Sequence, residues 1–154
     1  MTATTRAAGE WFGVRVGDIV LETGMAGAGE PVVWIQTALV ADELAPAARL
    51  VSHTGRYQTV AYHRRGYSGS SPTTGAGSIR RDAHDCASLL GALDIDRIHV
   101  VGVSYSAAVA LQLAADLPDR VASVCVIEPP RPSQNICWRS FSLTLSGSRA
   151  LSSR

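Results

Sequence analysis

The residues best suited to chemistry are the five from Gly102 to Ser106, which read GVSYS. They lie between an apolar run typical of a strand (RIHVV) and an alanine- and leucine-rich run typical of a helix (AAVALQLAAD). A serine in such a sharp turn holds its hydroxyl above the sheet, and small neighbours leave room for the turn. The N–H groups that open the helix can then stabilise a negatively charged oxygen. The pattern predicts that Ser104 is a nucleophile; a helix-capping serine and a phosphate-binding loop are the alternatives.

The elements that must position Ser104 alternate between strands and helices. Apolar–polar alternation around Gly17 and Asp18 predicts an antiparallel hairpin over residues 12–24, followed by a flexible loop over 25–30. Short apolar runs predict strands, and apolar residues at helical spacing predict helices, the first with Asp42 as its cap. The predicted strands cover residues 31–36, 59–65, 97–103 and 121–128, and the predicted helices cover 41–52, 78–93 and 105–117.

This order of elements predicts an α/β fold. A mostly parallel sheet carries helices on both faces and begins with an N-terminal antiparallel hairpin. Catalytic groups in such sheets gather beyond the carboxyl ends of the strands. Ser104 directly follows the predicted strand 97–103, so we expect it at that edge of the sheet.

Three segments resemble the α/β-hydrolase fold family. GVSYS resembles the nucleophile elbow G-x-S-x-G, with Ser106 in place of the last glycine. HRRGYSGSS resembles the family's D-x-R-G-x-G-x-S, with His63 where aspartate is frequent, and LPDRVASVCVIEPP resembles P-x-R-V followed by a strand. The likeness spans residues 12–130. It implies an incomplete α/β-hydrolase fold and a serine hydrolase that acts on an ester, an amide or a similar small acyl substrate, with no cofactor and no metal.

The resemblance also implies two backbone donors for an oxyanion hole. The family's loop after the strand at 31–36 usually reads H-G-x, and the matching residues here are Gln36, Thr37 and Ala38. The N–H groups of Ala38 and Tyr105 would then hold the oxyanion. We expect Gln36 to orient this loop or to face the substrate, and an ordinary polar residue at the end of a buried strand is the alternative.

A base and an acid for Ser104 are harder to assign. The family's chain order is Ser, then Asp or Glu, then His, yet no histidine follows Ser104 in this sequence. Glu128, at the end of the last predicted strand, is a candidate acid, and His63 is a candidate base because it ends a strand on the same edge as Ser104. We expect a C-terminally truncated chain, with part of a hydrolase domain over 1–130, an irregular serine-rich tail over 131–154, and impaired hydrolysis. An inactive remnant or a small-molecule-binding protein of the same fold is the alternative.

Composition excludes several other classes of protein. The chain has 154 residues, 46% of them hydrophobic and 18% charged, with a net charge of +1 and no basic block, so nothing indicates nucleic-acid binding. The N-terminal residues contain no apolar stretch long enough for a signal peptide or a membrane span, which predicts a soluble cytoplasmic protein. Three cysteines at spacings that fit no metal or redox motif predict buried or half-buried free thiols at Cys86, Cys125 and Cys137. The sequence leaves the oligomeric state open.

Overall fold

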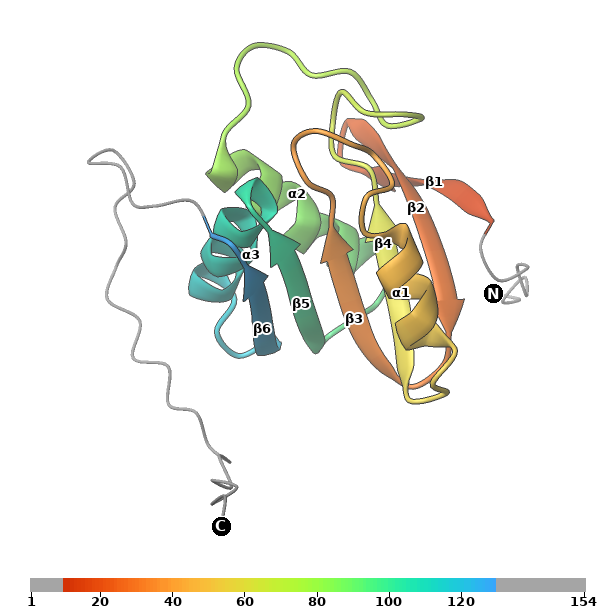
Figure 1. The fold of residues 1–154 in the computed structure, drawn as a ribbon. Helices are drawn as coiled ribbons and strands as arrows, with labels where there is room; N and C mark the ends of the chain where they lie inside the picture. The colour runs from red at the N-terminus through yellow and green to blue at the C-terminus, as the bar shows by residue number, and fades with distance from the viewer. Residues whose placement is uncertain (1–9, 130–154) are drawn as a thin grey trace.

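The computed structural model of the chain describes residues 10–129, which form six strands and three helices (Figure 1). The strands are β1 (Trp11–Val16), β2 (Ile19–Gly27), β3 (Glu30–Ile35), β4 (Tyr57–Tyr62), β5 (Ile98–Val103) and β6 (Val121–Ile127). The helices are α1 (Ala45–Ser52), α2 (Ile79–Ala92) and α3 (Tyr105–Asp116).

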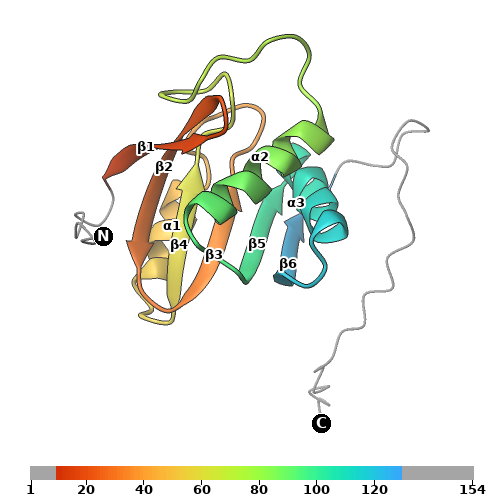
Figure 2. The same cartoon turned by 180° about the vertical axis from the view of Figure 1, so that it is seen from behind.

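The six strands form one sheet in the order β1-β2-β4-β3-β5-β6. β2 pairs antiparallel with both β1 and β4, whereas β4, β3, β5 and β6 run parallel to one another. Helix α1 covers one face of the sheet (Figure 1), and α2 and α3 lie together on the other face (Figure 2). The predicted α/β fold, with its antiparallel N-terminal hairpin and otherwise parallel sheet, is confirmed.

Both faces of the central strands are buried. Along β3, Val33 and Ile35 belong to the large core under α2 and α3, whereas Val32 and Trp34 belong to a smaller core under α1. Successive side chains of a strand point to opposite faces, so a strand with helices on both sides must be apolar throughout. This explains why the sequence of β3 is a continuous apolar run and shows no alternation.

Three local predictions about the first half of the chain were wrong. The strand predicted over 59–65 covers residues 57–62 instead. Residues 25–27, expected in a flexible loop, extend β2, because their backbone pairs with residues 58–60 of β4. Helix α1 begins at Ala45, four residues later than predicted, and its N-cap Leu44 makes no side-chain cap. Asp42 is therefore not the cap; its carboxylate lies 3.1 Å from a ring nitrogen of His63 instead.

The cysteines differ in their surroundings. Cys86 is fully buried in the core, and burial raises the pKa of its thiol to about 12. Cys125, expected to be buried or half-buried, is exposed because it lies on the edge strand β6. Cys137 and the predicted tail over 131–154 lie outside the described residues.

None of the helices between residues 10 and 129 combines the length and the apolar character that a membrane-crossing helix needs. The cytoplasmic location drawn from the sequence stays a prediction.

Candidate active site

Ser104 occupies a strained turn between β5 and α3. Its φ of 52° and ψ of −118° lie in the left-handed half of conformational space, where a residue with a side chain is rarely found. The backbone N–H of Ser104 donates to the C=O of Ile127 at 2.9 Å, which ties the turn to the end of β6. The residue is exposed. The turn therefore presents the hydroxyl to solvent beyond the carboxyl end of β5.

The residues on either side of Ser104 make this turn possible. A Cβ atom on Gly102 would lie 2.3 Å from the backbone oxygen of Ser106, so only glycine fits there. Ser106 is fully buried. Its hydroxyl donates to the C=O of Val103 at 2.9 Å and accepts from the N–H of Val103 at 2.8 Å. The sequence predicted only that the residue at position 106 had to be small. The structure adds that the hydroxyl of Ser106 hydrogen-bonds both backbone groups of Val103, the last residue of β5.

The two predicted oxyanion donors follow neighbouring strands of the sheet. Ala38 lies in the loop after β3 and is exposed, and its C=O accepts from the hydroxyl of Tyr67 at 2.7 Å. Tyr105 is the first residue of α3, where a backbone N–H has no acceptor within the helix. Because β3 and β5 are parallel neighbours, the two residues lie at the same edge of the sheet.

Gln36 lies at the start of the loop that carries Ala38. It is 3% exposed, and its side-chain oxygen accepts from the backbone N–H of Arg64 at 2.8 Å. Its own C=O accepts from Nε of Arg64 at 3.2 Å. The amide nitrogen of Gln36 has no partner among residues 10–129. These contacts fit a role in orienting the loop, and they fit equally the alternative of a hydrogen-bonded polar residue at the end of a buried strand.

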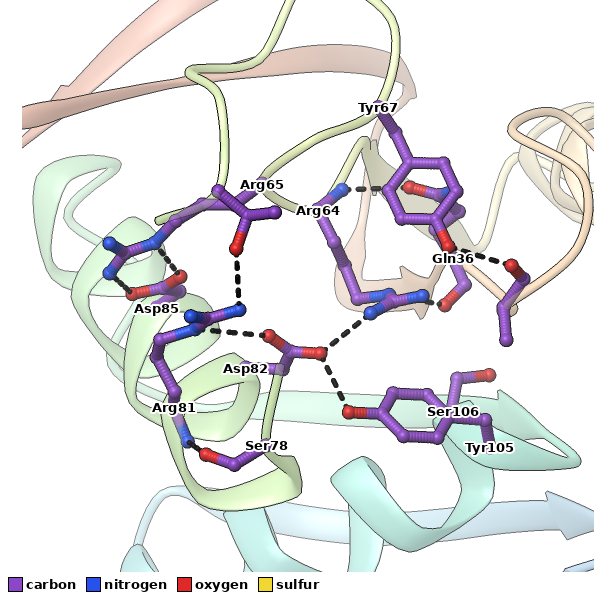
Figure 3. A network of polar contacts seen from close by, with 12 residues as sticks. Gln36, Arg64, Arg65, Tyr67, Ser78, Arg81, Asp82, Asp85, Tyr105 and Ser106 are labelled. Atoms are coloured by element: carbon purple, nitrogen blue, oxygen red, sulfur yellow. Dashed lines mark hydrogen bonds and ion pairs between the residues drawn. The ribbon is translucent and has the colours of Figure 1, made fainter. Parts of the chain in front are cut away.

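A buried polar network joins this loop to the elbow (Figure 3). Arg64 donates to the carboxylate of Asp82 at 2.6 Å and to the C=O of Thr37 at 2.8 Å. Asp82 also accepts from the hydroxyl of Tyr105 at 3.0 Å. Sequence reasoning missed Arg64 and Asp82; the available signal was that Asp82 and Asp85 share the face of the predicted helix 78–93 that carries its apolar residues.

His63 is held by carboxylates and does not reach Ser104. Nδ1 of its buried ring lies 2.8 Å from Glu22, and Nε2 lies 3.1 Å from Asp42. The indole of Trp11 stacks on the ring with centroids 4.2 Å apart. Both ring nitrogens are therefore occupied, and in this geometry neither can accept the proton of Ser104.

Glu128, the candidate acid, directly follows β6. It is exposed and adopts a φ of 47°. The preceding residue, Ile127, is the one whose C=O accepts from the N–H of Ser104. The chain thus brings Glu128 to the same edge of the sheet as Ser104.

The other histidines lie elsewhere. His84 is exposed on α2, and His53 follows the end of α1. His99, near the start of β5, lies 2.7 Å from the hydroxyl of Ser123 and 2.9 Å from Glu30, at the amino ends of the strands. Within residues 10–129, which include all four histidines, none hydrogen-bonds Ser104, and no cluster of three or more His, Cys, Asp or Glu residues could hold a metal ion.

Several known proteins resemble this chain in sequence or in structure. One is the dihydrolipoyllysine-residue acetyltransferase component of the acetoin cleaving system from Cupriavidus necator, 37% identical over 73 residues, which cover 47% of this chain and 20% of that protein. Among solved structures, E-2-(acetamidomethylene)succinate hydrolase is 26% identical with a TM-score of 0.69, over 75% of this chain and 43% of that one. A bacterial membrane phospholipase A is 24% identical with a TM-score of 0.74, over 80% of this chain and 40% of that one. The chain thus spans less than half the length of each of these proteins.

A sequence profile of the alpha/beta hydrolase fold family matches residues 19–148, which is most of the chain. The sheet order, the strained serine turn after β5 and the two structural relatives agree with that match. The chain therefore belongs to the alpha/beta hydrolase fold family.

Proposed function

We propose that this chain carries the nucleophile and the oxyanion-binding part of a serine hydrolase that acts on an ester, an amide or a similar acyl substrate. The observation that carries the proposal is the backbone of Ser104, a left-handed, exposed serine between a parallel strand and a helix. A protein gains no stability from placing serine in such a conformation, so the strain indicates a function. The relative at 26% identity is itself named as a hydrolase.

In this proposal the oxygen of Ser104 attacks the acyl carbon while a base takes the hydroxyl proton, and the alcohol or amine of the substrate takes that proton and leaves when the tetrahedral intermediate collapses. The N–H groups of Ala38 and Tyr105 donate to the oxygen that becomes negatively charged, which stabilises the tetrahedral intermediate more than the substrate. Loss of a single donor of this kind costs about 10²–10³-fold in rate. Glu128 is kept as the candidate acid, because it lies at the same edge of the sheet.

The base is the part that residues 10–129 do not supply. Both nitrogens of His63 are engaged by carboxylates, and the other histidines lie away from the elbow. We therefore expect the base to come from elsewhere in a full-length protein, and we expect this chain alone to react slowly. A site without its base retains about 10³–10⁴-fold catalysis over water through the oxyanion hole and binding.

The second candidate function is non-catalytic binding of a small molecule by the same fold, and the lack of a histidine next to Ser104 favours it. Prolonged labelling with a fluorophosphonate, read by peptide mass spectrometry, separates the two. We expect an adduct on Ser104 that is lost in Ser104→Ala. Ser123→Ala is the matched control. The hydroxyl of Ser123 contacts the imidazole of His99, and both residues lie at the opposite edge of the sheet from Ser104. A folded chain that shows no adduct on Ser104, whether or not Ser123 is labelled, would favour the binding protein.

A further inference from the structure

Arg64 lies just beyond β4, yet it is only 8% exposed, because its side chain reaches under the loop that follows β3. Nε donates to the C=O of Gln36 at 3.2 Å, and Nη2 donates to the C=O of Thr37 at 2.8 Å. The backbone N–H of Arg64 donates to the side-chain oxygen of Gln36 at 2.8 Å. Three hydrogen bonds from one residue thus fix the two residues directly before Ala38.

The bond to Thr37 also determines how Ala38 is oriented. The C=O of Thr37 and the N–H of Ala38 belong to one planar peptide group, and across a trans bond they point in opposite directions. By holding the carbonyl, Arg64 turns the N–H of Ala38 away from itself and fixes its direction. The positive charge on the guanidinium also polarises this peptide group, which makes the N–H a stronger donor.

The same guanidinium packs against the residue that carries the other donor. It lies between the rings of Tyr67 and Tyr105, with its carbon 4.9 Å and 4.7 Å from the two ring centroids (Figure 3). Asp82 accepts from Arg64 at 2.6 Å and from the hydroxyl of Tyr105 at 3.0 Å. Burial and the carboxylate of Asp82 raise the pKa of Tyr105 to about 12, so its hydroxyl keeps the proton that it donates.

We propose that Arg64 is a positioning residue that holds the N–H groups of Ala38 and Tyr105 in register for a single oxyanion. The inference rests on the proposed function, because it assigns Arg64 a role toward that hole. Arginine suits the position because its planar group offers donors in fixed directions to one carboxylate and two carbonyl groups, whereas lysine offers one nitrogen. Asp82 balances the buried charge and links it to the first residue of α3.

The test compares Arg64→Lys with Arg80→Lys, a matched change at an exposed position of α2. Two quantities are measured: kinact and KI for fluorophosphonate labelling of Ser104, and hydrogen–deuterium exchange of residues 36–40. We expect Arg64→Lys to lower kinact at least ~10-fold, because a displacement of about 1 Å near reacting groups can cost ~10²-fold. KI should stay close to that of the unmodified chain, and exchange of residues 36–40 should become faster. Arg80→Lys should change neither quantity.

A folded Arg64→Lys chain with unchanged kinact and unchanged exchange would overturn the inference. Where Arg64→Lys fails to fold, the double variant Arg64→Met/Asp82→Leu removes both buried charges together and replaces the pair by apolar groups. Slower labelling and faster exchange in that variant support the inference, and unchanged values overturn it. Where even the unmodified chain is not labelled, the proposed function fails, and exchange alone decides whether Arg64 fixes the loop: faster exchange supports this, and unchanged exchange rejects it.

Discussion

Ser104 keeps its strained backbone because its neighbours leave few other conformations. Gly102 allows the first turn of α3 to approach β5, and the buried hydroxyl of Ser106 holds both backbone groups of Val103. Ser106 is small enough to fit, and its hydroxyl makes two hydrogen bonds to Val103 that a glycine at this position could not make.

Gly102→Ala tests this explanation of the turn. The added Cβ would lie 2.3 Å from one backbone oxygen and 2.8 Å from a backbone nitrogen, and neither atom can move without shifting α3. We expect the free energy of unfolding to fall by about 1–3 kcal/mol, as for other overpacking substitutions. Chemical denaturation measures the change. Gly91→Ala is the control, since nothing lies within 4 Å of its added Cβ; in a helix this change should stabilise by ~0.5–1 kcal/mol. Equal effects of the two substitutions would contradict the account.

At the scale of secondary-structure elements, hydrogen bonds hold the loop after β4, which includes Gly69 and Ser70, against β2. The hydroxyl of Ser70 accepts from the N–H of Glu22 at 2.9 Å and donates to the C=O of His63 at 2.6 Å. The carboxylate of Glu22 accepts from the N–H of Gly69 at 2.8 Å and lies 2.8 Å from His63. His63, at the position where the family often has aspartate, thus serves to hold this loop, which also carries Arg64.

Glu22→Gln should reveal this fastening through its dependence on pH. The N–H of Gly69, with further help from His63 and Ser68, lowers the pKa of Glu22 below its ordinary value of 4.5, against the opposing effect of burial. A carboxyl whose pKa is lowered on folding stabilises the protein above its unfolded pKa, and this stability is lost as pH falls through the folded pKa. The unmodified chain should therefore be more stable than Glu22→Gln at neutral pH, and the difference should shrink below pH 4.5. Urea titrations across this range measure it, and a difference independent of pH would contradict the assignment.

Most strands and helices could be predicted because each shows its own hydrophobic periodicity or is bounded by turn and capping residues. Residues 25–27 could not, because they join β2 through backbone pairing with β4 and carry no apolar pattern of their own. The same reason applies within the site. Ser104 stands in a local strand–turn–helix pattern, whereas Arg64 and Asp82 are 18 residues apart and meet only after the sheet and α2 have packed. Long-range polar pairs of this kind leave little trace in a single sequence.

At the scale of the whole molecule, the carboxyl edge of the parallel strands collects the groups that the proposed chemistry needs. Ser104 and Tyr105 follow β5, and Ala38 follows β3. Arg64 follows β4 and contacts the segments that follow β3 and β5. A base is the component that residues 10–129 do not bring to Ser104. The proposed nucleophile and the proposed oxyanion hole thus lack a base among the described residues, in a chain that spans 43% of the related hydrolase.

The most direct test of this claim supplies the base from solution. The rate of fluorophosphonate labelling is measured with increasing imidazole, and the adduct is located by mass spectrometry. General-base catalysis contributes about 10²–10⁴-fold, so even a freely diffusing base should raise the rate severalfold. The account predicts an increase with imidazole concentration, an adduct on Ser104, and no such adduct in Ser104→Ala. A folded chain in which imidazole produces no adduct on Ser104 would contradict it.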